Sequence, residues 1–161
     1  MTPEELEEIL SILNATPEQI KEITKDLGRD CLTWKASPKH FSILENVCHL
    51  RDIEREGYTV RIERIVAEET PVLPDINGPQ LALERKYNEE NLEPALASFV
   101  DARSKTIALI KELSEDQFSR IGTFEDQGDM TLAGMLAVMC EHDQEHLRDI
   151  KEARDGFYRS R

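Results

Sequence analysis

Two histidines near the C-terminal end of the sequence have a spacing that suits metal binding. His142 and His146 lie four residues apart in the run CEHDQEH, and the apolar residues before them recur at intervals of three and four. Both imidazoles therefore continue the apolar stripe of one predicted helix, with their ring nitrogens on the same side. Helical HxxxH pairs of zinc enzymes use this geometry. Taken alone, the spacing also fits two solvated or hydrogen-bonded side chains.

A third ligand has to come from another part of the chain, and His49 is the best candidate. It lies inside a second predicted helix, in the run VCHLRD. A helical wheel places His49 about 180° from the centre of that helix's apolar stripe, beside Ile53, Glu56 and Val60. His49 must therefore face a second neighbouring element if it is to join the pair. The remaining histidine, His40, is predicted to lie in an exposed loop before that helix.

Carboxylates near the histidines could move protons during metal-assisted catalysis. Glu45, Asp52 and Glu145 are the candidate catalytic residues, because they are close in sequence to the histidines. Glu56 and Asp143 are candidates on the same ground. Nearness in sequence does not choose among them.

The elements that position these residues are four amphipathic helices. The first begins near Leu6, and Thr16-Pro17 predicts a break followed by a second helical stretch that ends at Gly28. The second has a capping box at its start, in which Ser42 and Glu45 satisfy each other's backbone donors, and it runs to about residue 69.

The third and fourth helices follow two predicted connections. Residues 71–79, PVLPDINGP, predict a loop that forms a long crossover, and residues 122–129 predict a polar connection without strands. The third helix is expected over about 92–113, with Asn91 as a candidate N-cap. Thr131 is expected to cap the fourth helix, which reaches about Ala153 before a frayed tail.

Together these patterns predict one all-α domain over residues 1–161. Four amphipathic helices bury their apolar stripes most simply in an antiparallel four-helix bundle, here with a long crossover between helices two and three. A chain of 161 residues is long enough to bury such a core.

The composition restricts the partners and the location. The net charge of −13 and the interspersed Lys and Arg residues disfavour nucleic acid and membrane surfaces as partners. With neither a signal peptide nor a membrane span in view, we expect a cytoplasmic protein. Cys31, Cys48 and Cys140 are expected to be reduced thiols buried in the core.

Two segments carry a family resemblance: HFSILENVCHLRDIEREGY and TLAGMLAVMCEHDQEHLRDI. They resemble the DinB/YfiT superfamily of small bacterial metalloproteins, and the similarity extends from Thr16-Pro17 to the final helix. The motif of that family is one histidine in the second helix and an HxxxH pair in the last, which corresponds to His49, His142 and His146. Where many members have tryptophan before the serine of the capping box, this chain has Phe41.

The resemblance implies a bundle that holds one divalent metal ion, with zinc or nickel as the first candidates, and it makes a homodimer plausible. The superfamily is described as metal-dependent hydrolases, so a hydrolase that uses metal-activated water on a small-molecule substrate is the leading hypothesis. The superfamily also includes enzymes that use a low-molecular-weight thiol, so a metal-dependent thiol S-transferase is the alternative. A third possibility, of another class, is a helical bundle in which the metal is structural or stored and nothing is catalysed.

Overall fold

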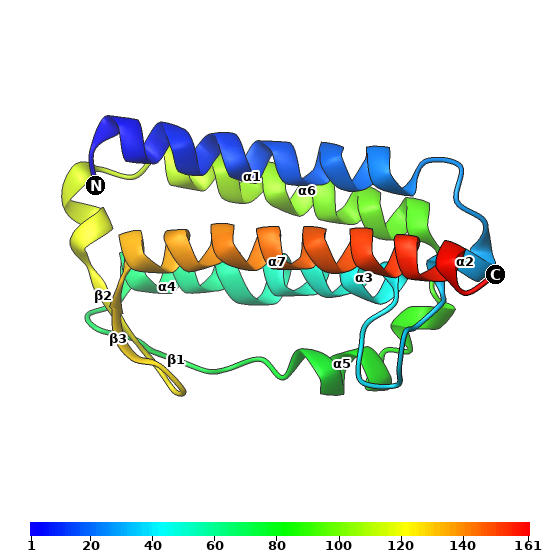
Figure 1. Ribbon diagram of the computed structural model, residues 1–161. Helices are drawn as coiled ribbons and strands as arrows, with labels where there is room; N and C mark the ends of the chain where they lie inside the picture. The colour runs from blue at the N-terminus through cyan, green and yellow to red at the C-terminus, as the bar shows by residue number, and fades with distance from the viewer.

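Four long helical segments form a bundle in the computed structural model, which describes residues 1–161. They are α1 (Pro3–Thr24), the continuous series α3 (Ile43–Asp52), η1 (Ile53–Tyr58) and α4 (Thr59–Ala67), then α6 (Leu92–Lys111) and α7 (Leu132–Arg159). Both α1 and α3 pack against α6 and α7, which closes a ring of four (Figure 1). The predicted four-helix bundle is confirmed. None of these helices combines the length and the apolar composition needed to cross a bilayer.

The direction of the helices explains the long crossover. Figure 1 shows that α1 and α7 run one way along the bundle, whereas α3–α4 and α6 run the other way. Because the second and third long helices are parallel, the chain must return along the bundle between them. The return path contains β1 (Val72–Leu73), α5 (Gly78–Glu84) and the short 3-10 helix η2 (Tyr87–Glu89). The predicted crossover is therefore confirmed.

Its interior differs from the predicted loop. Within the predicted loop, the Asn77 side chain accepts a hydrogen bond from the backbone of Gln80 at 3.0 Å and caps α5. Val72 and Leu73 form a strand that pairs in parallel with β2 (Ile121–Phe124).

The predicted polar connection before the last helix is a β-hairpin. Strand β2 pairs antiparallel with β3 (Gly128–Thr131), so the sheet has the order β1-β2-β3. The expectation that the chain lacks strands is wrong here, because strands of two and four residues are too short to show a clear alternation. Leu73 and Phe124 are nevertheless buried, which attaches the crossover and the hairpin to the bundle.

Helix α1 continues through Pro17, so the predicted break is wrong. Proline has no N–H to donate, and the carbonyl group four residues earlier, that of Leu13, loses its helical partner. The structure replaces that partner with Arg103 of α6, whose Nη1 donates to the Leu13 oxygen at 3.0 Å. A tertiary contact thus compensates for a defect that would otherwise end the helix.

Arg103 lies at the centre of a buried ion-pair network. Its side chain is 2% exposed, and its guanidinium donates to Glu54 at 3.0 Å and to Asp143 at 2.6 and 2.9 Å. With the contact to Leu13, one side chain joins α1, η1, α6 and α7. Such charge-assisted, bidentate bonds fix geometry as well as adding energy.

The second long helix contains one π-helical turn. The predicted single helix over about 43–69 is present, but Ile53–Tyr58 are wound more loosely, and Thr59 Oγ1 donates to the Glu54 carbonyl oxygen at 2.8 Å. An inserted π turn changes the direction of every later side chain. The helical wheel therefore fails beyond it, and Val60, predicted to share a face with His49, is exposed.

The last helix is longer than predicted. It continues past Ala153 to Arg159, and Phe157 is buried. The reason is Trp34, in the segment after the short helix α2 (Arg29–Leu32), whose ring packs edge-on against Phe157 and lies directly over Gly156. The expectation of a frayed tail is therefore wrong up to Arg159.

The apolar core consists of two clusters of buried side chains. One cluster is built around Ile20, Phe99 and Ile150, and the other around Leu13, Ile62 and Leu136, with Phe118 from the 3-10 helix η3 (Glu115–Ser119). In the sequences of α6 and α7, the buried polar residues Arg103, Thr106 and Asp143 fall between the stretches that each helix contributes to the two clusters.

We expect Arg103→Met to lower the free energy of unfolding by about 3–5 kcal/mol, because it leaves two buried carboxylates without a cation. Urea unfolding measures the loss. Arg64→Met is the matched control, since it removes an exposed ion pair with Glu68 that water screens, and it should cost far less stability. A triple variant that also carries Glu54→Leu and Asp143→Leu should regain part of the stability. Equal losses in Arg103→Met and Arg64→Met would contradict the role of the network.

Candidate metal centre

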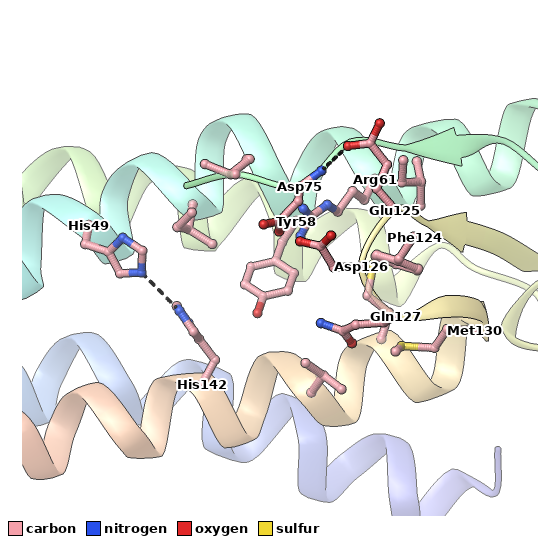
Figure 2. Close-up of a pocket in the computed structure, with 15 residues that line it drawn as sticks. His49, Tyr58, Arg61, Asp75, Phe124, Glu125, Asp126, Gln127, Met130 and His142 are labelled. Atoms are coloured by element: carbon pink, nitrogen blue, oxygen red, sulfur yellow. Dashed lines mark hydrogen bonds between the residues drawn. The ribbon is translucent and has the colours of Figure 1, made fainter. Parts of the chain in front are cut away.

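The three predicted histidine ligands meet inside the bundle. His49 of α3 and His142 of α7 point toward one another in Figure 2, with their Nε2 atoms 3.1 Å apart. His146 Nε2 lies 3.1 Å from His142 Nε2, and the candidate ligand atoms of all three residues lie within 4.8 Å of one another. The fold thus brings together a pair from one helix and a single histidine that is 93 residues away.

Asn46 fixes which nitrogen of His146 carries the proton. The Asn46 amide nitrogen donates to the Ser42 carbonyl oxygen at 2.8 Å, so its Oδ1 is left as an acceptor. That oxygen lies 2.6 Å from His146 Nδ1, which must therefore be the protonated nitrogen. Nε2 of His146 then presents its lone pair to the other two rings. This is the arrangement by which metal-binding histidines are commonly oriented.

Burial keeps the three rings neutral. Burial, together with the positive charge that His142 could carry, lowers the pKa of His49 to about 4 and the pKa of His146 to about 2. Burial also lowers the pKa of His142, although the carboxylate of Asp143 acts in the opposite direction. Neutral imidazole is the form that binds metal ions.

The arrangement fits a divalent transition metal ion. Zn–N bonds of about 2.0–2.1 Å in a tetrahedral site place neighbouring nitrogens about 3.3 Å apart, close to the 3.1 Å observed here. A single hydrogen atom can join only two of three facing nitrogens, whereas one cation can bind all three. The buried Nδ1 atoms of His49 and His142 have no hydrogen-bond partner, so hydrogen bonding within the chain does not account for the position of these rings.

Two residues close the walls around the cluster. Phe41 packs against His49, with ring centroids 5.5 Å apart, and stacks on His146 at 6.4 Å. On another side the crossover brings Gly78 against His49, where an added Cβ atom would lie 2.5 Å from Cε1 and 2.8 Å from Nδ1. Helix α5 is therefore the second neighbouring element that His49 was required to face.

The structure places the predicted proton-transferring carboxylates in other contacts. Glu45 accepts hydrogen bonds from the Ser42 backbone in the capping box and pairs with Lys35. Glu145 is exposed. The other three candidates form ion pairs with arginines. Asp52 pairs with Arg51 and Arg85, Glu56 with Arg85, and Asp143 with Arg103.

A cavity of about 220 Å³ opens beside His49 and His142. Seen in Figure 2, it extends from the two histidines toward the hairpin and the start of the crossover. Its other polar lining residues were not identified from the sequence, because most of them lie on the connections between helices. They are Asp75 of the crossover, Glu125, Asp126 and Gln127 of the hairpin, and Tyr58 and Arg61 of the second long helix. The acidic run EDQG of the hairpin was visible as polar, but nothing in the sequence placed it near the histidines.

Comparison with known proteins agrees with the histidine cluster and the fold. A model of the DinB superfamily matches residues 12–150, a range that includes all three histidines. The chain belongs to the DinB superfamily. The resemblance seen in the sequence is thus confirmed.

Two relatives illustrate this membership. A protein of Oceanobacillus iheyensis named "Putative metal-dependent hydrolase OB0413" is 21% identical over 95% of this chain and 87% of its own length. The structure of YfiT from Bacillus subtilis, described as a probable metal-dependent hydrolase with an unusual four-helix bundle topology, superposes with a TM-score of 0.89. The match covers 98% of this chain and 90% of YfiT at 20% identity, and at that identity it establishes the fold alone.

Gly78→Ala should weaken Zn²⁺ binding by about tenfold or more, because the added methyl group displaces the His49 ring. Competition with a chromophoric chelator measures the Kd. Gly28→Ala is the matched control, since a Cβ atom there has nothing within 4 Å, and it should leave the Kd unchanged. Equal affinities in the two variants would show that the close approach of Gly78 does not position His49.

Asn46→Leu should lower Zn²⁺ affinity about 10–100-fold by removing the acceptor that orients His146. Asn46→Asp keeps an acceptor at the same position and should retain most of the affinity. The same chelator competition compares the two variants. If both variants lose the same amount of Zn²⁺ affinity, the loss does not come from the orientation of His146 by an acceptor at position 46.

Proposed function

We propose that this protein is a metal-dependent hydrolase in which His49, His142 and His146 hold one divalent transition metal ion. The observation that carries the proposal is the convergence of three neutral imidazole nitrogens beside a cavity large enough for a small molecule. Membership of the DinB superfamily and the names given to two similar proteins agree with it.

The site favours catalysis over a structural or storage role for the metal. The cluster supplies three ligand side chains, and the cavity reaches two of them, His49 and His142. Structural zinc sites are usually closed by a fourth protein ligand, whereas catalytic sites keep a position open for water or substrate. When bound, a divalent ion in such a site lowers the pKa of a coordinated water and provides a hydroxide nucleophile at neutral pH.

The chain's own residues supply the rest of the environment. Burial holds the three imidazoles in the neutral form, and Asn46 orients His146. Ile53, Phe124 and Met135 give the cavity beside the histidines an apolar part of its wall. Zinc and nickel are the metals that we propose first, because imidazole suits both.

Metal content tests the ligand set. Protein prepared without a histidine tag and reconstituted with Zn²⁺ or Ni²⁺ should bind about one equivalent, and His146→Ala should bind less than about a tenth of that. The metal should also raise the Tm of the wild type but not of His146→Ala, because ligands that bind only the folded state stabilise it. His40→Ala, which changes an exposed histidine outside the cluster, is the control. Equal metal content in all three proteins would refute the centre.

Turnover tests the reaction class. Metal-loaded wild type should hydrolyse 4-nitrophenyl acetate faster than the metal-free protein, and His146→Ala should lose that difference. Adding cysteine to the assay distinguishes thiol transfer from hydrolysis. A thiol transferase would form acetylated cysteine, whereas a hydrolase would still form acetate. A bound metal with neither product would favour the non-catalytic alternative.

A further inference from the structure

Tyr58 has an unusual position beside the histidines. It ends the π turn η1, is 5% exposed, and meets the ring of His142 edge-on with centroids 5.9 Å apart. Its ring packs within the apolar cluster that contains Ile62 and Leu136, and its hydroxyl lies at the cavity. Figure 2 shows the hydroxyl directed into the space toward α7.

The Tyr58 hydroxyl makes no hydrogen bond within the chain. Tyr87 offers a comparison, because its buried hydroxyl donates to Asp52 at 2.7 Å. A buried phenol usually finds a partner, since an unmet donor costs free energy. Tyr58 lines the cavity, so a partner can reach its hydroxyl from there.

The Tyr58 hydroxyl can act as a hydrogen-bond donor. A phenol has an ordinary pKa of about 10, so it keeps its proton at neutral pH. The hydroxyl points into the cavity and is available to donate a hydrogen bond there.

We propose that the cavity binds small acyl compounds, esters in particular, and that the Tyr58 hydroxyl donates a hydrogen bond to the carbonyl oxygen as it gains negative charge. This inference rests on the hydrolase function proposed above. It makes Tyr58 a catalytic residue that sequence reasoning did not single out, and it gives the cavity a substrate class.

The step balances without proton transfer from Tyr58. The oxygen of a water molecule bonds to the carbonyl carbon, and the π electron pair moves onto the carbonyl oxygen, which accepts the Tyr58 hydrogen bond. The pair then re-forms the double bond as the bond to the alcohol breaks. The departing alcohol takes a proton that came from the water. Donors aimed at such an oxygen act where charge develops, so they raise kcat more than they lower KM.

The test compares the wild type with Tyr58→Phe. The matched control is Tyr158→Phe, which removes the hydroxyl of an exposed tyrosine. All three proteins are loaded with Zn²⁺, and their metal content and Tm are measured. Metal content and Tm should both be unchanged in Tyr58→Phe, because the lost hydroxyl has no hydrogen-bond partner in the chain. Binding of 4-nitrophenyl methylphosphonate, a tetrahedral anion that mimics water addition to 4-nitrophenyl acetate, is followed by calorimetry.

Tyr58→Phe should bind the phosphonate about tenfold or more weakly and should lower kcat for 4-nitrophenyl acetate about 100-fold with little change in KM. In the wild type, the ¹³Cζ resonance of Tyr58 should shift when the phosphonate binds, which gives a readout independent of any variant.

Equal phosphonate affinity in wild type and Tyr58→Phe, no binding by either, or an unmoved ¹³Cζ resonance would overturn the inference. Turnover that is unaffected by Tyr58→Phe would overturn it too, while leaving the hydrolase function in place. Phosphonate binding that depends on the hydroxyl, in a protein without turnover, would support the donor role and overturn the hydrolase function instead.

Discussion

The buried guanidinium of Arg103 is the contact on which the rest of the structure depends. It satisfies the carbonyl that Pro17 leaves free in α1 and pairs with carboxylates on η1 and α7. One of those carboxylates, Asp143, is the neighbour of His142, and the other, Glu54, is in the same helical series as His49. The ion pairs therefore fix how the two ligand-bearing segments sit relative to each other. A buried charge is costly unless fully paired, so few other arrangements of these helices are accessible.

What could be predicted from the sequence follows from local rules. The period of the α-helix places His142 and His146 on one side, and the Ser42 capping box and the Thr131 cap fix where two ligand-bearing helices begin. Those signals depend on residues within one or two turns of each other. They were sufficient for the bundle, for the crossover and for the HxxxH pair, whereas His49 as the third ligand followed from the resemblance to the DinB/YfiT superfamily.

The remaining features depend on contacts between distant parts of the chain. Pro17 is tolerated because of a contact from Arg103, which lies 86 positions further along the chain. Asp52 is paired not only with its neighbour Arg51 but also with Arg85, which is 33 positions away. The π turn has no simple signature in its residue types, so the wheel that placed Val60 on the same face as His49 was wrong beyond the turn. Most of the cavity's polar lining comes from the crossover and the hairpin, whose short strands are stabilised by pairing with each other.

The position of Gly78 has a consequence for how the protein is made. The ring of His49 rests against the crossover on one side and against the last long helix on the other. On a ribosome, helix α3 would emerge with its histidine uncovered, and the pocket for that ring could close only after some ninety further residues had been synthesised. Until then, His49 can hold a metal only weakly, so tight binding waits until His142 and His146 have been synthesised.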